Sequence, residues 1–262
     1  MIYKVTDVLG WLEKSEQKFK LDDDTYSNRG NSWDYCYLKF KQAYSKIKCF
    51  SPNEIDDLAQ ALAVYLSSWG MYRGSSFLLN SDYKIHIKPI ETILKYKDLA
   101  INDNLFDEPT IKDRLFGDRG IYNELELYYK SAKESLGKTN VKNEIPSDTL
   151  ISKILLGVYG CIPAYDQNFK KGISCWNGQQ TLTRTGSAIY GSNRKKIKSL
   201  NQILENQVLY EELYSYWKNH PRYTFMKVVD MYFYGLGLYI STEKIKVQDI
   251  KHEIEKYYHT YM

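Results

Sequence analysis

The chain has 262 residues, of which 43% are hydrophobic, and its 36 basic and 32 acidic side chains give a net charge of +4. This balance is typical of a globular protein with one large domain or two small ones, and it excludes a polybasic, histone-like protein. The spacing of Cys36, Cys49, Cys161 and Cys175 lacks the close pairs of a zinc site and favours reduced thiols. No apolar stretch has the length of a signal peptide or a membrane span, so we expect a cytoplasmic protein with no membrane partner.

Helix signals dominate the first third of the sequence. The strongest follows Ser51, where Pro52 suits the first helical position and Glu54 completes a capping box. Apolar residues then recur at helical spacing, and Gly70 is expected to end the helix. The same spacing predicts earlier helices over residues 6–19, with Thr6 as the cap, and 32–40.

The remaining segments continue this pattern. We predict further helices over residues 89–99, 119–136, 147–155, 200–217, 224–238 and 247–258. No convincing run of alternating strands occurs, so we predict an all-α protein whose helices pack in two groups. Residues 1–262 are interpreted as a single helical domain, with a polar hinge at 137–146 that suggests subdomains 1–140 and 147–262.

Charge is distributed unevenly near the middle of the chain. The 38 residues from Gln167 to Leu204 contain no Asp or Glu but seven positive charges, which leaves the rest of the chain at −3. Glycines and short polar side chains in this segment would let its backbone approach phosphates closely. We therefore predict a nucleic-acid-binding surface, with Trp176 as a stacking or wedge residue. Its cations are Lys170, Lys171, Arg184, Arg194, Lys195, Lys196 and Lys198. The alternative is a solvated loop followed by a lysine-rich helix start.

Asp166 lies just before this basic segment. The apolar helix that begins near Ile151 is broken by glycine, the chain turns through Ile162-Pro163, and Asp166 follows where a new helix would begin. A carboxylate at that position can cap amides or, partly shielded from water, act as a catalytic acid or electrostatic stabiliser. A simple helix cap is the structural alternative.

The segment Ile162-Pro-Ala-Tyr-Asp166 and the helices around it resemble part of the helical DNA glycosylases of the helix-hairpin-helix superfamily. In those enzymes an apolar-Pro-x-x-Asp element presents the catalytic aspartate, and Asp166 takes its place here. The resemblance covers this stretch alone. It departs from the family in one respect, because the glycine turn at 157–160 lies too close to Asp166 to be the family's hairpin.

The resemblance implies a glycosylase-like fold with a DNA-binding cleft. The catalytic lysine of the bifunctional members has no counterpart, so the resemblance implies a monofunctional enzyme in which Lys153 is a helix-surface residue. Small phage-defence glycosylases that remove modified cytosines are similar in size. Such an enzyme flips the nucleotide out of the stack, and Asp166 would stabilise positive charge on the sugar and help to activate water, without a cofactor or metal.

A second cluster follows the helix that starts after Ser51. The stretch from Ser67 to Phe77 combines stacking faces at Trp69 and Tyr72 with the rigid donor fork of Arg73. We interpret these residues, together with Tyr165, as a base pocket. Trp69 is in phase with the core, so packing is its alternative role, and Arg73 could instead form an ion pair between helices.

Other candidates carry less weight. Asp230 lies in an otherwise apolar helix and must be paired if buried, with Arg73 as one candidate partner. Asp22–Asp24 lacks the spacing of a calcium loop, and the histidines are not spaced as metal ligands.

Two functional hypotheses therefore remain. The leading one is a glycosylase acting on modified DNA, such as phage DNA, and the alternative is a non-catalytic nucleic-acid-binding or defence-accessory protein in which Asp166 is only a cap. A helical ribonuclease with a closely spaced Arg–His pair is disfavoured, because His86 lies 13 residues beyond Arg73.

Overall fold

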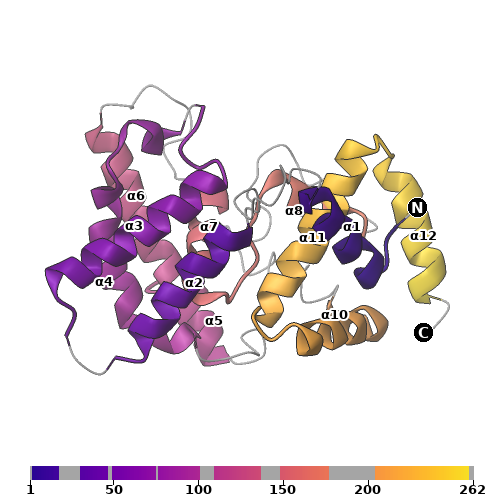
Figure 1. Cartoon of the computed structure of the whole chain (residues 1–262), viewed down its shortest axis with the longest axis horizontal. Helices are drawn as coiled ribbons and strands as arrows, with labels where there is room; N and C mark the ends of the chain where they lie inside the picture. The colour runs from indigo at the N-terminus through magenta and orange to yellow at the C-terminus, as the bar shows by residue number, and fades with distance from the viewer. Residues whose placement is uncertain are drawn as a thin grey trace. The chain divides into compact units, whose positions relative to one another are not determined.

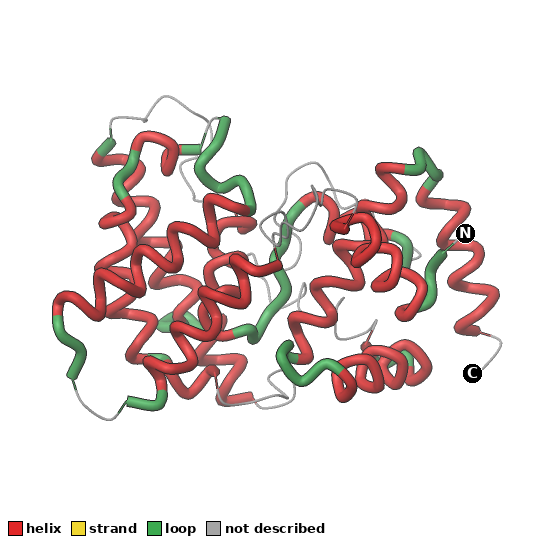
Figure 2. The backbone as a smooth tube through the Cα atoms, in the orientation of Figure 1, coloured by secondary structure: helices red, strands yellow, loops and turns green. Residues whose placement is uncertain are grey.

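The computed structural model describes residues 2–17, 30–46, 49–74, 76–100, 109–136, 148–176 and 204–259. In these ranges the regular secondary structure is entirely helical, as Figure 2 shows. The all-α prediction is therefore confirmed. Among the helices of these ranges, none has both the length and the apolar character needed to cross a bilayer.

Internal contacts divide the chain into two compact units (Figure 1). One comprises residues 1–27 and 162–262, and its helices are α1 (Val5–Gln17), α8 (Gln167–Ser174), α10 (Gln207–Asn219), α11 (Phe225–Thr242) and α12 (Val247–His259). The other comprises residues 28–161. It holds α2 (Gly30–Tyr44), α3 (Pro52–Ser68), α4 (Ile87–Lys95), α5 (Pro109–Phe116), α6 (Ile121–Ser135) and α7 (Asp148–Tyr159), with 3₁₀ turns η2 (Phe77–Asn80), η3 (Tyr83–His86) and η4 (Lys97–Ala100).

The predicted hinge at 137–146 lies outside the described residues, whereas the internal contacts divide the chain between residues 27 and 28 and between residues 161 and 162. Helices α6 and α7, on either side of that stretch, belong to the same unit. The Tyr122 hydroxyl on α6 donates to Asp148 Oδ1 on α7 over 2.8 Å.

Helix α3 forms as its sequence predicts. Ser51 Oγ accepts from the Glu54 amide, and Glu54 Oε2 accepts from the Ser51 amide over 2.9 Å, so the capping box is complete. The helix ends at Ser68, and Gly70 follows with a φ of +75°, a conformation that glycine adopts without strain. Local sequence signals are therefore sufficient to set both ends of α3.

Some other boundaries depend on distant residues. Helix α1 begins at Val5, ahead of the predicted cap Thr6, because Glu212 Oε2 on α10 accepts from the Val5 amide over 3.1 Å. Helix α10 begins only after Asn206, whose side chain accepts from the Leu209 amide, although the prediction started at residue 200. The sequence also did not predict α5 or the 3₁₀ turns.

The abundant tyrosines connect helices within each unit. In the unit of residues 28–161, the Tyr44 hydroxyl donates to Val158 O and that of Tyr159 donates to Ile93 O. In the other unit, the Tyr232 hydroxyl donates to Tyr3 O. Each ring fills the core while its hydroxyl satisfies a backbone carbonyl, which explains much of the aromatic excess through packing.

Helices α8 and α11 approach so closely that their backbones touch. A Cβ at Gly172 would lie 2.0 Å from Phe233 O, and a Cβ at Gly237 would lie 1.9 Å from Asn168 O. No other residue fits these two positions without moving a helix. The glycines therefore fix α8, and the Asp166 that precedes it, against α11.

Candidate active site

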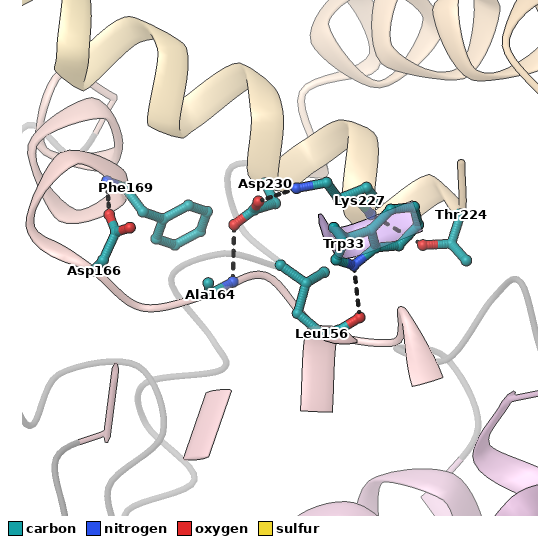
Figure 3. Close-up of polar contacts among 8 residues, drawn as sticks. All are labelled: Trp33, Leu156, Ala164, Asp166, Phe169, Thr224, Lys227 and Asp230. Atoms are coloured by element: carbon teal, nitrogen blue, oxygen red, sulfur yellow. Dashed lines mark hydrogen bonds and ion pairs between the residues drawn. The ribbon is translucent and has the colours of Figure 1, made fainter. Parts of the chain in front are cut away.

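Asp166 is the N-cap of α8, as its position in the sequence predicts. Its Oδ1 accepts from the Phe169 amide over 3.0 Å, and the side chain is only partly buried (Figure 3). An aspartate in this role satisfies an amide that the helix itself leaves without a partner. The carboxylate is thereby held in one orientation at the start of α8.

The loop that leads to Asp166 is buried and is anchored from α11. Asp230 Oδ1 accepts from the Ala164 amide over 2.9 Å, two residues before Asp166 (Figure 3). Ile162 and Tyr165 in the same loop are fully buried. Asp230 therefore fixes the backbone that delivers Asp166.

Asp230 is itself neutralised by a lysine that the sequence analysis did not single out. Lys227 Nζ lies 3.0 Å from Asp230 Oδ2, and the two side chains are only 5% and 8% exposed. The proposed pairing of Asp230 with Arg73 is replaced by this contact within α11. The spacing of three residues between Lys227 and Asp230 was the available signal, since such pairs share one helix face.

Two of the predicted phosphate-binding cations lie on α8. Lys170 Nζ is 4.4 Å from the ring centroid of Tyr165, and Lys171 Nζ donates to Ser241 Oγ over 2.9 Å. Both lysines are partly exposed beside Asp166. Tyr165 is enclosed by protein, so the structure gives this predicted base-pocket residue a core position under Lys170.

Trp176 is tied to its own unit. Its ring centroid is 4.6 Å from that of Tyr258, and its Nε1 donates to the Tyr232 hydroxyl over 3.3 Å. These contacts pack the ring against its own unit, and the residue stays partly exposed. The remaining predicted cations, Arg184, Arg194, Lys195, Lys196 and Lys198, lie outside the described residues.

The other predicted base-pocket residues belong to the unit of residues 28–161. Trp69 is partly exposed, and Lys153 Nζ lies 4.8 Å from its ring centroid. Lys153 is only 3% exposed, so its assignment as a helix-surface residue was wrong. Helix α7 is buried on all sides, which the apolar residues around Lys153 could have indicated.

Arg73 and Tyr72 occupy the turn after α3. The Arg73 side chain is exposed and folds over Gly70, where a Cβ would lie 2.6 Å from its Nε. Among the described residues Arg73 forms no ion pair, so the predicted inter-helix pairing does not occur there. The Tyr72 hydroxyl lies 2.7 Å from Nε2 of the fully buried His86.

His86 was missed as a polar centre because an isolated histidine carries no sequence signal. Its Nδ1 lies 2.7 Å from the hydroxyl of the fully buried Tyr129. Burial lowers the pKa of His86 to about 3, so the ring is neutral at ordinary pH. Burial raises the pKa of Tyr72 to about 12, with a contribution from Asp82, and its hydroxyl keeps its proton.

Metal and thiol chemistry gain no support from the described ranges, where no group of three or more His, Cys, Asp or Glu gathers as in a metal site. Cys36, Cys161 and Cys175 are buried, and burial raises the pKa of each thiol. They therefore remain protonated and unreactive.

Comparison of the chain with protein-family models, with curated proteins and with solved structures found no match.

Proposed function

We propose that the chain is a DNA glycosylase-like hydrolase that excises a modified base from DNA, such as phage DNA. The observation that carries this proposal is the placement of Asp166, a partly exposed residue whose Oδ1 is held by the Phe169 amide. Asp166 follows a buried loop that Asp230 anchors. It begins α8, which packs closely on α11 at Gly172 and Gly237. Rigid support of this kind is what a group needs if it is to meet a transition state in one geometry.

In this reaction the bond between the sugar carbon and the base nitrogen breaks, and its electron pair leaves with the base. Positive charge then develops on the sugar, where the Asp166 carboxylate stabilises it and orients the attacking water. The water loses a proton as its oxygen bonds to the sugar carbon, and the departing base is protonated. The nucleotide must first leave the stack, since the sugar carbon is inaccessible within the duplex.

The cations next to Asp166 would hold the DNA backbone. Lys170 and Lys171 are partly exposed on α8, at the start of the acid-free segment 167–204. Contacts of this kind set the position of a protein on DNA without reading sequence.

A non-catalytic nucleic-acid-binding protein is the second candidate. Its specific support is the hydrogen bond from the Phe169 amide to Asp166 Oδ1, which gives the carboxylate a structural task. In that case only the cations contribute to function.

The two candidates are separated by one substitution. Asp166→Asn retains an oxygen that can cap α8 but removes the charge. Purified wild-type protein and this variant are incubated with plain and modified phage DNAs, then treated with an abasic-site endonuclease and resolved on a gel. Asp249→Asn is the matched control, because Asp249 is an exposed aspartate in the first turn of α12, in the same unit as Asp166.

Strand breaks in one modified DNA that require Asp166 but not Asp249 would support the glycosylase. Intact DNA that is nevertheless retarded by both variants in a low-salt gel would support the binding protein and leave Asp166 as a cap.

A further inference from the structure

Helix α10 carries a row of three aromatic rings, those of Tyr210, Tyr214 and Trp217, which we call the ring row. The ring centroids of Tyr210 and Tyr214 are 5.9 Å apart with planes inclined by 19°, and the ring of Trp217 meets Tyr214 edge-on at 5.4 Å. Phe225 supports the row from the buried side, since its ring lies 5.4 Å from that of Tyr210 and 5.9 Å from that of Trp217. Tyr214 is 38% exposed, and the other two members are partly exposed. The ring row therefore presents aromatic surface to solvent.

Two cations lie at the C-terminal end of the ring row. Lys218 Nζ is 5.0 Å from the ring centroid of Tyr214 and 4.7 Å from that of Trp217. Trp217 Nε1 also donates to Tyr223 O over 3.0 Å, and the Arg222 guanidinium lies 4.4 Å from the centroid of the Tyr223 ring. Lys218 and Arg222 are both exposed, and among the described residues neither has a carboxylate within ion-pair distance. The aromatic contacts thus hold two positive charges beside the exposed rings.

The carboxylates around α10 are engaged elsewhere. Glu211, near the opposite end of the ring row, accepts from Gln207 Nε2 over 2.9 Å. Glu13 on α1 accepts from the Tyr216 hydroxyl over 2.8 Å, and Glu212 accepts from the backbone of α1 and from tyrosines of α12. Positive charge is therefore confined to the C-terminal end of the row. A ligand that combines a flat ring with a phosphate on one side matches this distribution.

We propose that the ring row is a stacking surface for a base of single-stranded DNA, whose adjacent phosphate is bound by Lys218 and Arg222. Proteins that bind unpaired strands without reading sequence combine aromatic side chains and cations in this way. Apart from Tyr214, the exposed residues of α10 are polar, so the face lacks the continuous apolar core of a stable protein–protein interface. The ring row belongs to the unit that holds Asp166, and the inference rests on the proposed function in one respect, namely that the ligand is DNA.

Stacking is tested with two fluorescently labelled strands of equal length and charge, a short oligothymidylate and the corresponding strand of abasic sites. Anisotropy measurements on the full chain should show about tenfold tighter binding of the strand that carries bases. Tyr214→Leu removes an exposed ring but keeps an apolar side chain, and this preference should be lost. Equal affinity for the two strands, no binding of either, or a preference undiminished in Tyr214→Leu would overturn the inference.

The phosphate contacts are tested by the salt dependence of oligothymidylate binding. Lys218→Gln and Arg222→Gln should each reduce the slope of log affinity against log salt by about 0.7, the value for one contact on a single strand. The matched controls are Tyr35→Leu and Lys39→Gln in the other unit, where Lys39 Nζ lies 5.7 Å from the ring centroid of the exposed Tyr35. Both controls should bind like wild type. An equal change of slope in Lys39→Gln would mean that Lys218 and Arg222 act only through net charge, and the phosphate site would be wrong.

This inference and the proposed function fail separately. Base release that depends on Asp166, from a protein that shows no preference for strands with bases, would remove the stacking surface and leave the glycosylase. Base-dependent binding that requires Tyr214, without base release from any DNA, would support the stacking surface and contradict the glycosylase.

Discussion

At the scale of single residues, burial decides charge state. His86 and the Lys227–Asp230 pair are polar groups in the core, and each is satisfied by neighbours within its own unit. His86 is held neutral, whereas Lys227 and Asp230 compensate each other. A buried polar group that loses its partner cannot bind water instead. Removing the partner therefore changes the free energy of unfolding strongly.

The first prediction concerns acid stability. The pKa of His86 is lowered from 6.5 to about 3 in the folded chain. Between these values the unfolded chain binds a proton that the native chain does not, so the free energy of unfolding falls as pH falls through this window. By pH 5 the loss from His86 is about 2 kcal/mol. Urea unfolding at pH 7 and pH 5 should therefore show a weaker pH dependence in His86→Gln, and equal dependence in both proteins would contradict this account.

The second prediction concerns the buried ion pair. Asp230→Ala leaves Lys227 without its carboxylate and the Ala164 amide without its acceptor, and should cost about 3–5 kcal/mol in unfolding free energy. The double variant Lys227→Met/Asp230→Asn removes both charges and keeps an acceptor for Ala164, so it should be more stable than Asp230→Ala. Urea unfolding measures the stability of both variants. A double variant no more stable than Asp230→Ala would show that the charge of Lys227 does not cause the loss of stability in the single variant.

At the scale of elements, the close packing of α8 on α11 is the feature that fixes Asp166. It depends on Gly172, in the last turn of α8, and on Gly237, inside α11, although glycine lowers intrinsic helix stability. The Asp166 cap and the Asp230 anchor then act on a helix already held in place. Tertiary contact here outweighs helix propensity.

A pair of glycine substitutions tests this packing. Gly237→Ala inserts a Cβ against Asn168 O and should lower the free energy of unfolding by about 3 kcal/mol. Gly10→Ala in α1 is the matched control. Apart from the neighbouring backbone of α1 itself, no heavy atom lies within 4 Å of the new Cβ. The control should instead raise stability by about 0.5–1 kcal/mol. Thermal unfolding measures the stability of both variants. A Gly237→Ala variant as stable as wild type would mean that α8 and α11 can move apart without loss of stability.

At the scale of the whole molecule, charge is local. The net charge is only +4, although seven positive charges fall within the acid-free segment 167–204. Affinity for DNA that depends on this segment must be sensitive to salt, since each phosphate contact releases counterions.

Replacing the cations Arg184, Arg194, Lys195, Lys196 and Lys198 with Gln lowers the net charge from +4 to −1. If all five contact phosphates, the slope of log affinity against log salt should fall by about 4–5 on duplex DNA. The control replaces exposed cations of the other unit, namely Lys41, Lys88, Lys95, Lys97 and Arg119, and makes the same change in net charge. Fluorescence anisotropy across a salt series measures both slopes, and equal slopes would indicate a non-specific effect of net charge.

The sequence by itself determined the helical class and the best-capped helices. Ser51 and Glu54 form their capping box, and Asp166 caps the next helix after the Ile162-Pro163 turn. These features depend on residues within one helical turn, so local patterns are sufficient to predict them.

Tertiary structure decided everything that depends on distant partners. The Val5 end of α1 requires Glu212, the loop before Asp166 requires Asp230, and His86 acquires its role only between Tyr72 and Tyr129. Lys153 and Tyr165 became core residues for the same reason, because periodicity identifies the faces of a helix but not the side chains that cover them.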